Sequence, residues 1–145
     1  MKKKLFALAL IAVFAFAMCA CGGADTTAIP DISGEYQDEV SQRAELTLVK
    51  TADDSYEIGI SWANSATETV YWSATGTFDG SVLSYGSGEK HLYTYGEDGE
   101  LVDDVTEETG LSGTLTLGDE AKLTWAGATE EETAVFVLTS NVDGE

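Results

Sequence analysis

Two cysteines, Cys19 and Cys21, are the first residues of this sequence whose type and spacing could do chemistry, and the chain holds no others. A disulfide between them would close a very small loop and would remove little entropy from the unfolded chain. A zinc site would need further Cys or His ligands, and the only histidine is His91. The pair is therefore a poor structural disulfide and a poor metal site, so a covalent modification of one thiol is favoured.

The cysteines follow a positively charged and then apolar segment. Residues 2–4 are Lys-Lys-Lys, and residues 5–18 form an unbroken apolar run, which is the layout of a secretory signal. The run is shorter than the ~20 apolar residues that a transmembrane helix needs. With the small Ala20 before Cys21 and Gly22 after it, this segment resembles the lipobox of bacterial lipoproteins.

That resemblance covers residues 1 to about 23 and implies a fate for the N-terminus. Cys21 would receive a diacylglycerol, and residues 1–20 would be removed as a signal peptide. Cys19, which follows the larger Met18, stays open as the alternative. The acylated protein, carrying chains such as palmitate, would be held on the extracytoplasmic side of the bacterial cell membrane. Residues 21–31 would then form a flexible tether, residues 32–140 a single domain, and residues 141–145 a tail.

The chain is strongly acidic. It contains 26 Asp and Glu against 7 Lys and Arg, a net charge of −19. Removal of the three lysines at residues 2–4 would leave four basic residues against the same 26 acids, or −22. Such a surface repels nucleic acid and attracts cationic partners. Three Trp, six Tyr and five Phe supply apolar material for a core and argue against a disordered acidic chain.

Apolar residues alternate with polar ones along nearly the whole domain, which indicates β-strands with one wet face. Short turns join them, and Asp79-Gly80 and Asp98-Gly99 are the sharpest hairpin signals, with a further turn expected at Ser87-Gly88. Neighbouring strands must then pair antiparallel. The strands expected are 32–38, 44–50, 55–62, 68–78, 81–86, 90–96, 100–106, 111–118, 121–127 and 132–140.

The sequence therefore predicts an all-β fold, an antiparallel up-and-down meander of eight to ten strands. A twisted meander of this size closes into a small barrel because closure removes its exposed edges; a β-sandwich is the alternative. The layout resembles the small barrels of lipocalins and avidins, with Gly34-Glu35-Tyr36 in the place of their Gly-x-Trp. That resemblance implies a small hydrophobic ligand inside the barrel.

Aromatic residues on the inward faces are the candidate ligand-binding residues. They either fill the core or line a pocket at one end of the barrel. Tyr71, Tyr93 and Tyr95 are expected outside, where a cluster would form a contact surface. The inward candidates are Tyr56, Trp62, Trp72, Phe78 and Trp125.

Catalytic motifs are not found, so the sequence predicts a protein that is not an enzyme and needs no cofactor. Residues 110–114 depart from the Gly-x-Ser-x-Gly pattern of serine hydrolases, and His91 has no nucleophile near it in the sequence. Asp103-Asp104 and Glu107-Glu108 could gather calcium, but they fit better as a charged edge that prevents strand aggregation. No metal site is therefore expected, and a carboxylate-dependent hydrolase is a minor alternative.

These observations favour a non-enzymatic binding module on the membrane surface. Its ligand is either a small hydrophobic molecule in the barrel or a cationic protein or peptide at acidic loops. The second resembles the lipoprotein inhibitors of lysozyme, small barrels on a lipid tether, although their disulfide is absent here. An envelope lipoprotein with a structural or folding-assistance role and no ligand is a third possibility. The volume inside the barrel separates the first two hypotheses.

Overall fold

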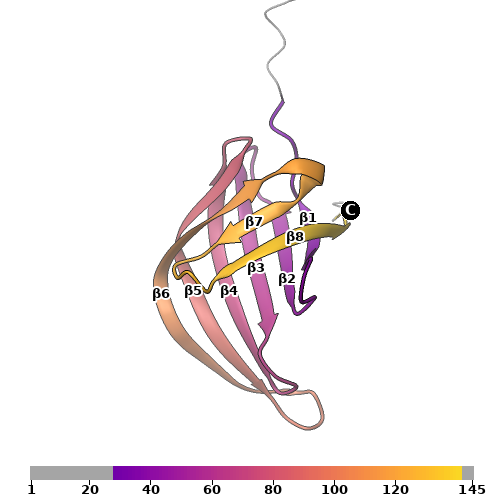
Figure 1. Ribbon diagram of the computed structural model, residues 1–145. Coiled ribbons are helices and arrows are strands. Elements are labelled where there is room, and N and C mark those ends of the chain that lie inside the picture. The colour runs from indigo at the N-terminus through magenta and orange to yellow at the C-terminus, as the bar shows by residue number, and fades with distance from the viewer. Residues whose placement is uncertain (1–27, 142–145) are drawn as a thin grey trace, which may run out of the picture.

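The computed structural model describes residues 28–141, which fold into eight antiparallel strands and one short 3₁₀ turn (Figure 1). Within these residues no helix has the length and hydropathy needed for a membrane span. The elements are β1 (Gly34–Asp38), β2 (Ala44–Lys50), β3 (Ser55–Ala63), β4 (Glu68–Phe78), β5 (Val82–Tyr95), β6 (Leu101–Leu117), η1 (Asp119–Ala121), β7 (Leu123–Ala126) and β8 (Thr133–Ser140).

Each strand pairs with the strands before and after it in sequence, and β1 pairs with β8 to close the ring. The predicted up-and-down meander and its closure are therefore confirmed, and the β-sandwich is not formed. The ring is uneven, because β6 has 17 residues and β7 only 4. Figure 1 shows the consequence: the long β5–β6 hairpin extends well past the short β7–β8 hairpin.

The interior is built from the inward residues of the alternating pattern. Ile58 is 4% exposed, Trp72 9% and Leu115 0%. The inward placement that alternation gives these three residues is therefore confirmed. Burial of such side chains contributes about 1.5–3 kcal/mol each. The other buried apolar residues are Ile32, Tyr36, Ala44, Leu46, Leu48, Tyr56, Ile60, Phe78, Leu83, Tyr85, Leu123, Trp125, Ala134 and Phe136.

One end of the ring is sealed by the segment that precedes β1. Tyr36 Oη donates to Ile32 O at 2.8 Å, and Ile32 N–H donates to Tyr56 Oη at 3.3 Å. Phe78 packs edge-on against Tyr56, with ring centroids 6.2 Å apart. We call this end, where the chain enters the domain, the closed end.

Two predicted interruptions are wrong, because β5 and β6 each run continuously. The expected turn at Ser87-Gly88 is a bulge inside β5, where Ser87 adopts a φ of 56° and the register with β4 shifts. A bulge takes up the extra residue without ending the strand. The expected break between residues 106 and 111 is likewise part of β6. The hairpin turns at Asp79-Gly80 and Asp98-Gly99 are confirmed, with positive φ at both glycines.

The strand predicted over residues 121–127 is shorter than expected. Ala121 belongs to η1 and is exposed, although alternation over residues 121–127 would place it on the inward face with Trp125. Its φ is 58°, in the left-handed region that interrupts a regular strand. Leu123 and Trp125, the next two inward residues, are buried as predicted.

Candidate functional site

The ring is open at the end opposite the closed end because its strands differ in length. β6 pairs with β7 only through Thr114–Leu117. Before Thr114, β6 continues alongside β5, so β3 to β6 extend as a curved sheet past the β7–β8 turn (Figure 1). We call the opening between this sheet and the turn at residues 127–132 the mouth.

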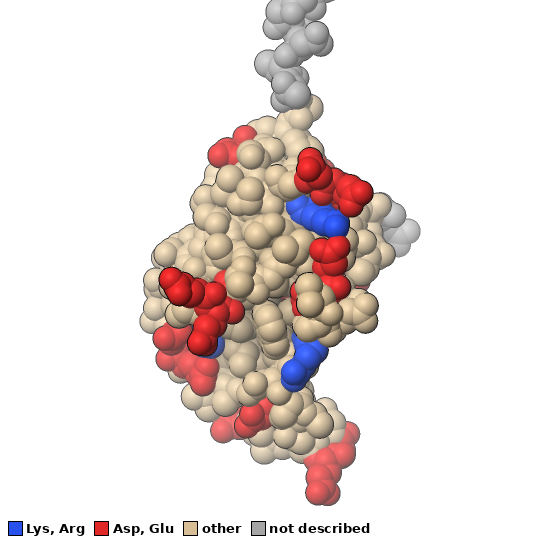
Figure 2. Space-filling model, viewed as in Figure 1, with Lys and Arg blue, Asp and Glu red and all other residues tan. Residues whose placement is uncertain are grey.

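A pocket of about 410 Å³ lies elsewhere, on the outer face, but the pocket of about 330 Å³ at the mouth contains most of the candidate residues. Figure 2 shows the same side of the molecule, with acidic side chains gathered beside the β7–β8 hairpin and again at the far end of the long hairpin. The mouth pocket is lined by Trp62, Asn64, Val70, Trp72, Lys90, Glu108, Trp125, Thr129, Glu131 and Glu132.

Three tryptophans from β3, β4 and β7 converge in this pocket. Trp125 is fully buried, and its Nε1–H donates to Tyr85 Oη at 3.0 Å. Trp72 meets it edge-on at 5.1 Å between centroids, a favourable arrangement for two aromatic rings. Trp62 is half-buried and packs against the core. The mouth therefore has a rigid aromatic base and one partly accessible indole.

Lys90 brings the only positive charge in the lining of this pocket. Its Nζ lies 3.6 Å from Glu132, 3.9 Å from Glu108 and 4.0 Å from Glu107. The same ammonium sits 5.5 Å from the centroid of the Trp72 ring, within cation–π range. The mouth therefore holds a cation between carboxylates and an aromatic face.

Glu132 is the least exposed of these carboxylates, at 7%. Its Oε2 accepts the backbone N–H of Ala128 at 2.8 Å, and its Oε1 faces Lys90. A Cβ on Gly127 would lie 2.5 Å from Oε2, so glycine at this position leaves room for the side chain to fold back over the turn. A buried carboxylate costs free energy unless it is paired and hydrogen-bonded, and both partners are present.

Trp72 carries an unmet hydrogen-bond donor. Its Nε1–H is buried and has no acceptor among the described residues. An unsatisfied buried donor costs about 1–3 kcal/mol. An acceptor brought in by a ligand or by water would recover that free energy.

Two of the five candidate ligand-binding residues lie away from the mouth. Tyr56 and Phe78 are 0% and 1% exposed at the closed end, where they are core residues. Trp62, Trp72 and Trp125 are brought together as lining residues. Sequence reasoning missed both Lys90 and Glu132. For Lys90, the expected turn at Ser87-Gly88 concealed which face of the strand the side chain occupies.

The interior beyond the mouth is filled by side chains. A hollow of about 10 Å³ next to Trp72, Tyr85 and Gly88 is close to the volume that admits a single water molecule. This hollow is too small for the hydrophobic ligand that the resemblance to lipocalins implied, whereas the mouth pocket of about 330 Å³ has room for a larger group.

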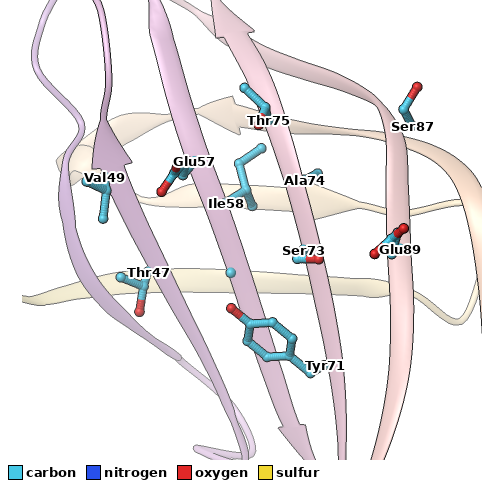
Figure 3. Close-up of a pocket in the computed structure, with 11 residues that line it drawn as sticks. Thr47, Val49, Glu57, Ile58, Tyr71, Ser73, Ala74, Thr75, Ser87 and Glu89 are labelled. Carbon is cyan, nitrogen blue, oxygen red and sulfur yellow. The ribbon is translucent and has the colours of Figure 1, made fainter. Parts of the chain in front are cut away.

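The pocket of about 410 Å³ is a groove on the outer face of β2 to β5 (Figure 3). Gly59 and the short side chains of Thr47 and Ser73 leave it hollow, and the Tyr71 ring lies against Gly59. Its charged lining residues, Glu57 and Glu89, are both acidic. The groove is the wet face that the alternation predicted, and unlike the mouth it has no lysine or arginine in its lining.

Tyr71 and Tyr93 stack on that outer face with ring centroids 5.6 Å apart, and His91 lies 5.9 Å from Tyr93. His91 is half-buried on β5. Its Nδ1 is 2.8 Å from Asp104 Oδ1, and its Nε2 is 3.4 Å from Glu89 Oε2. The contact between His91 and Asp104 joins β5 to β6 within the long hairpin.

The pKa of His91 should lie above its ordinary value of 6.5, chiefly because Asp104 accepts a hydrogen bond from the imidazolium. The raised pKa means that this contact stabilises the fold fully below about pH 6.5, and that the contribution is lost as pH rises through the higher folded-state pKa. Histidine NMR titration measures the pKa directly. Asp104→Asn should lower it, whereas Asp53→Asn, in a distant turn, should leave it unchanged. A wild-type pKa at or below the ordinary value would contradict the assignment.

Within residues 28–141, no three His, Cys, Asp or Glu side chains are grouped so that they could hold a metal ion. The acidic pairs that could have gathered calcium lie along β6 and are exposed. Cys19 and Cys21 lie outside the described residues.

Comparison of the chain with protein-family models, with curated proteins and with solved structures gave no match. What the protein binds must therefore be argued from the mouth itself.

Proposed function

We propose that this protein is a non-enzymatic, lipid-anchored binding module of the bacterial envelope whose mouth binds a cationic side chain of a basic protein or peptide. The proposal selects the second of the two ligand classes considered from the sequence. Dense packing inside the ring disfavours the first class, because the hollow beside Trp72 measures about 10 Å³. A net charge of −22 after signal removal favours the second.

The position of Lys90 is the observation that carries this proposal. Its ammonium is held by three carboxylates and the face of Trp72, which is the chemistry that recognises a foreign ammonium or guanidinium. Glu131 also lines the pocket, so carboxylates outnumber Lys90 and the site stays negative. A cation from a partner would find unneutralised charge and the accessible part of Trp62.

The direction in which the chain enters the domain also supports the proposal. Residues 28–33 join the domain at the closed end, where Ile32 contacts Tyr56. The β7–β8 turn, whose residues line the mouth, lies away from that end (Figure 1). A lipid on Cys21, joined through a short tether, would hold the closed end toward the membrane. The mouth would then face away from the lipid and toward soluble partners.

Binding should be selective for cations and should depend on Trp62. The full-length chain in a neutral detergent is titrated by calorimetry with a lysine decapeptide and with a glutamate decapeptide. Only the lysine peptide should bind, and more weakly as NaCl rises from about 50 to about 500 mM, because salt screens exposed charges. Trp62→Ala should weaken binding by about tenfold, whereas Tyr71→Ala, in the aromatic pair on the outer face, should leave the affinity near that of wild type.

Equal binding of the two peptides, or full affinity in Trp62→Ala, would contradict recognition of a cation at the mouth. The anchor is tested separately. Mass spectrometry of the purified protein should show a diacylglycerol on the N-terminal residue, and Cys21→Ala should abolish the modification and release the protein from membranes. Cys19→Ala is the matched control and should retain both. Loss of the lipid in Cys19→Ala alone would move the anchor to that residue.

A further inference from the structure

The first part of β6 has a backbone edge without a partner. Residues 101–110 are all exposed and pair with β5 on one side. On the other side β7 reaches only as far as Thr114, and no other described strand pairs with this segment. Ten residues of strand extend for about 33 Å. Their outward N–H and C=O groups form a template on which another strand can pair.

Carboxylates occupy both faces of this edge. Asp103 is opposite Thr94 and Val105 is opposite Leu92, whereas Asp104 is opposite Tyr93. Cross-strand partners share a face, so Asp103 and Asp104 lie on different faces. An added strand, whose side chains also alternate, would meet acidic groups on both sides.

The same edge exposes apolar side chains. Leu101 is 54% exposed, Val102 69% and Val105 47%. An exposed edge with apolar residues would ordinarily pair with a second copy of the same chain. Here each copy presents the same carboxylates, so two such edges repel each other. A basic strand would meet attraction instead of repulsion, and its aliphatic stems would cover the exposed apolar groups.

We propose that residues 101–110 of β6 bind an extended, basic segment of a partner polypeptide by strand addition. Strand addition rests on the proposed function, because it assigns a backbone conformation to the same cationic partner. Glu108 connects the two sites, since it belongs to β6 and also lines the mouth. A segment paired along the edge would therefore reach the mouth, where one of its lysines or arginines could enter.

Two peptides of equal charge separate the backbone contribution from the charge contribution. One is a decapeptide of alternating Lys and Thr, and the other is the same sequence with the backbone N-methylated at every second residue on the pairing side. Both are titrated against the full-length chain in neutral detergent. N-methylation blocks ladder hydrogen bonds while leaving the charge unchanged, so it should weaken binding by about tenfold or more. Hydrogen exchange should slow in residues 101–110 with the unmodified peptide only.

Side-chain variants test the charge contribution. The double variant Asp103→Asn/Asp104→Asn changes two edge residues that lie outside the mouth, and it should weaken binding of the unmodified peptide by several-fold. The matched control Asp53→Asn/Glu57→Gln removes the same charge from exposed positions away from β6 and should have a smaller effect. Equal loss in the two double variants would mean that net charge alone, and not this edge, attracts the peptide.

The outcomes distinguish the two proposals. Equal affinity of the two peptides, with no protection of residues 101–110, would overturn strand addition while leaving recognition at the mouth intact. Failure of both peptides to bind would overturn both proposals and would leave the acidic edge as a guard against aggregation. Protection of the edge at high protein concentration without peptide would identify a second copy of the chain as the occupant.

Discussion

Replacing Trp125 with alanine should lower the free energy of unfolding by about 3–5 kcal/mol, the range seen when a large buried aromatic side chain is deleted. Trp125 is 0% exposed, supports the Trp72 ring at 5.1 Å and donates a hydrogen bond to Tyr85 Oη. Its loss would leave a cavity beneath the mouth and would remove the partner of a buried hydroxyl. A domain of this size is stable by only about 5–15 kcal/mol, so the variant should be near the limit of folding.

Urea unfolding followed by circular dichroism measures this change, and Trp62→Ala is the control. Trp62 is half-buried at the rim, so its removal should cost only about 1 kcal/mol. The two variants therefore separate stability from binding. Trp125→Ala should mainly destabilise the fold, and Trp62→Ala should mainly weaken binding of the peptide. Equal destabilisation by both would mean that the mouth is packed more uniformly than the burial pattern indicates.

Lys90→Met should lower the free energy of unfolding by about 1–3 kcal/mol near neutral pH, because it removes the cation that faces a buried carboxylate. Glu132 is 7% exposed and would be left among other acidic side chains with only the Ala128 N–H as a partner. Adding Glu132→Gln removes the uncompensated charge. The double variant should therefore recover much of the lost stability, and a double-mutant cycle measures the coupling.

The same substitution should affect binding in the opposite direction. Without Lys90, the Trp72 face and the surrounding carboxylates are free for the cation of a partner, so a lysine decapeptide should bind more tightly to Lys90→Met than to wild type. Lys50→Met, which removes a cation that pairs with Asp31 outside the mouth, is the matched control for net charge. Weaker binding in Lys90→Met than in this control would show that Lys90 supports the ligand instead of occupying its place.

Much of the fold could be predicted because an antiparallel strand with one wet face repeats every two residues. The strand boundaries expected at 44–50 and 68–78 are those observed. Ring closure followed from short turns and from the cost of exposed edges. In both cases local patterning and global packing require the same arrangement.

The mouth could be predicted only in part. Alternation placed Trp62, Trp72 and Trp125 on inward faces, but it carries no information on how far neighbouring strands overlap. The short pairing of β7 with β6 through Thr114–Leu117 is set by strand length in three dimensions. The bulge at Ser87 was hidden for a different reason, since a serine at positive φ inside a strand leaves no clear signal in the sequence.

The indole N–H signals of the three tryptophans give the most direct test of a cation site at the mouth. In ¹⁵N-labelled full-length protein in neutral detergent, titration with the lysine decapeptide should shift the Nε1–H resonances of Trp62 and Trp72. The Trp125 resonance should move least, because its N–H is buried and already donates to Tyr85. If the peptide binds while the signals of Trp62 and Trp72 stay unchanged, the cation is recognised elsewhere and the proposed site at the mouth is wrong.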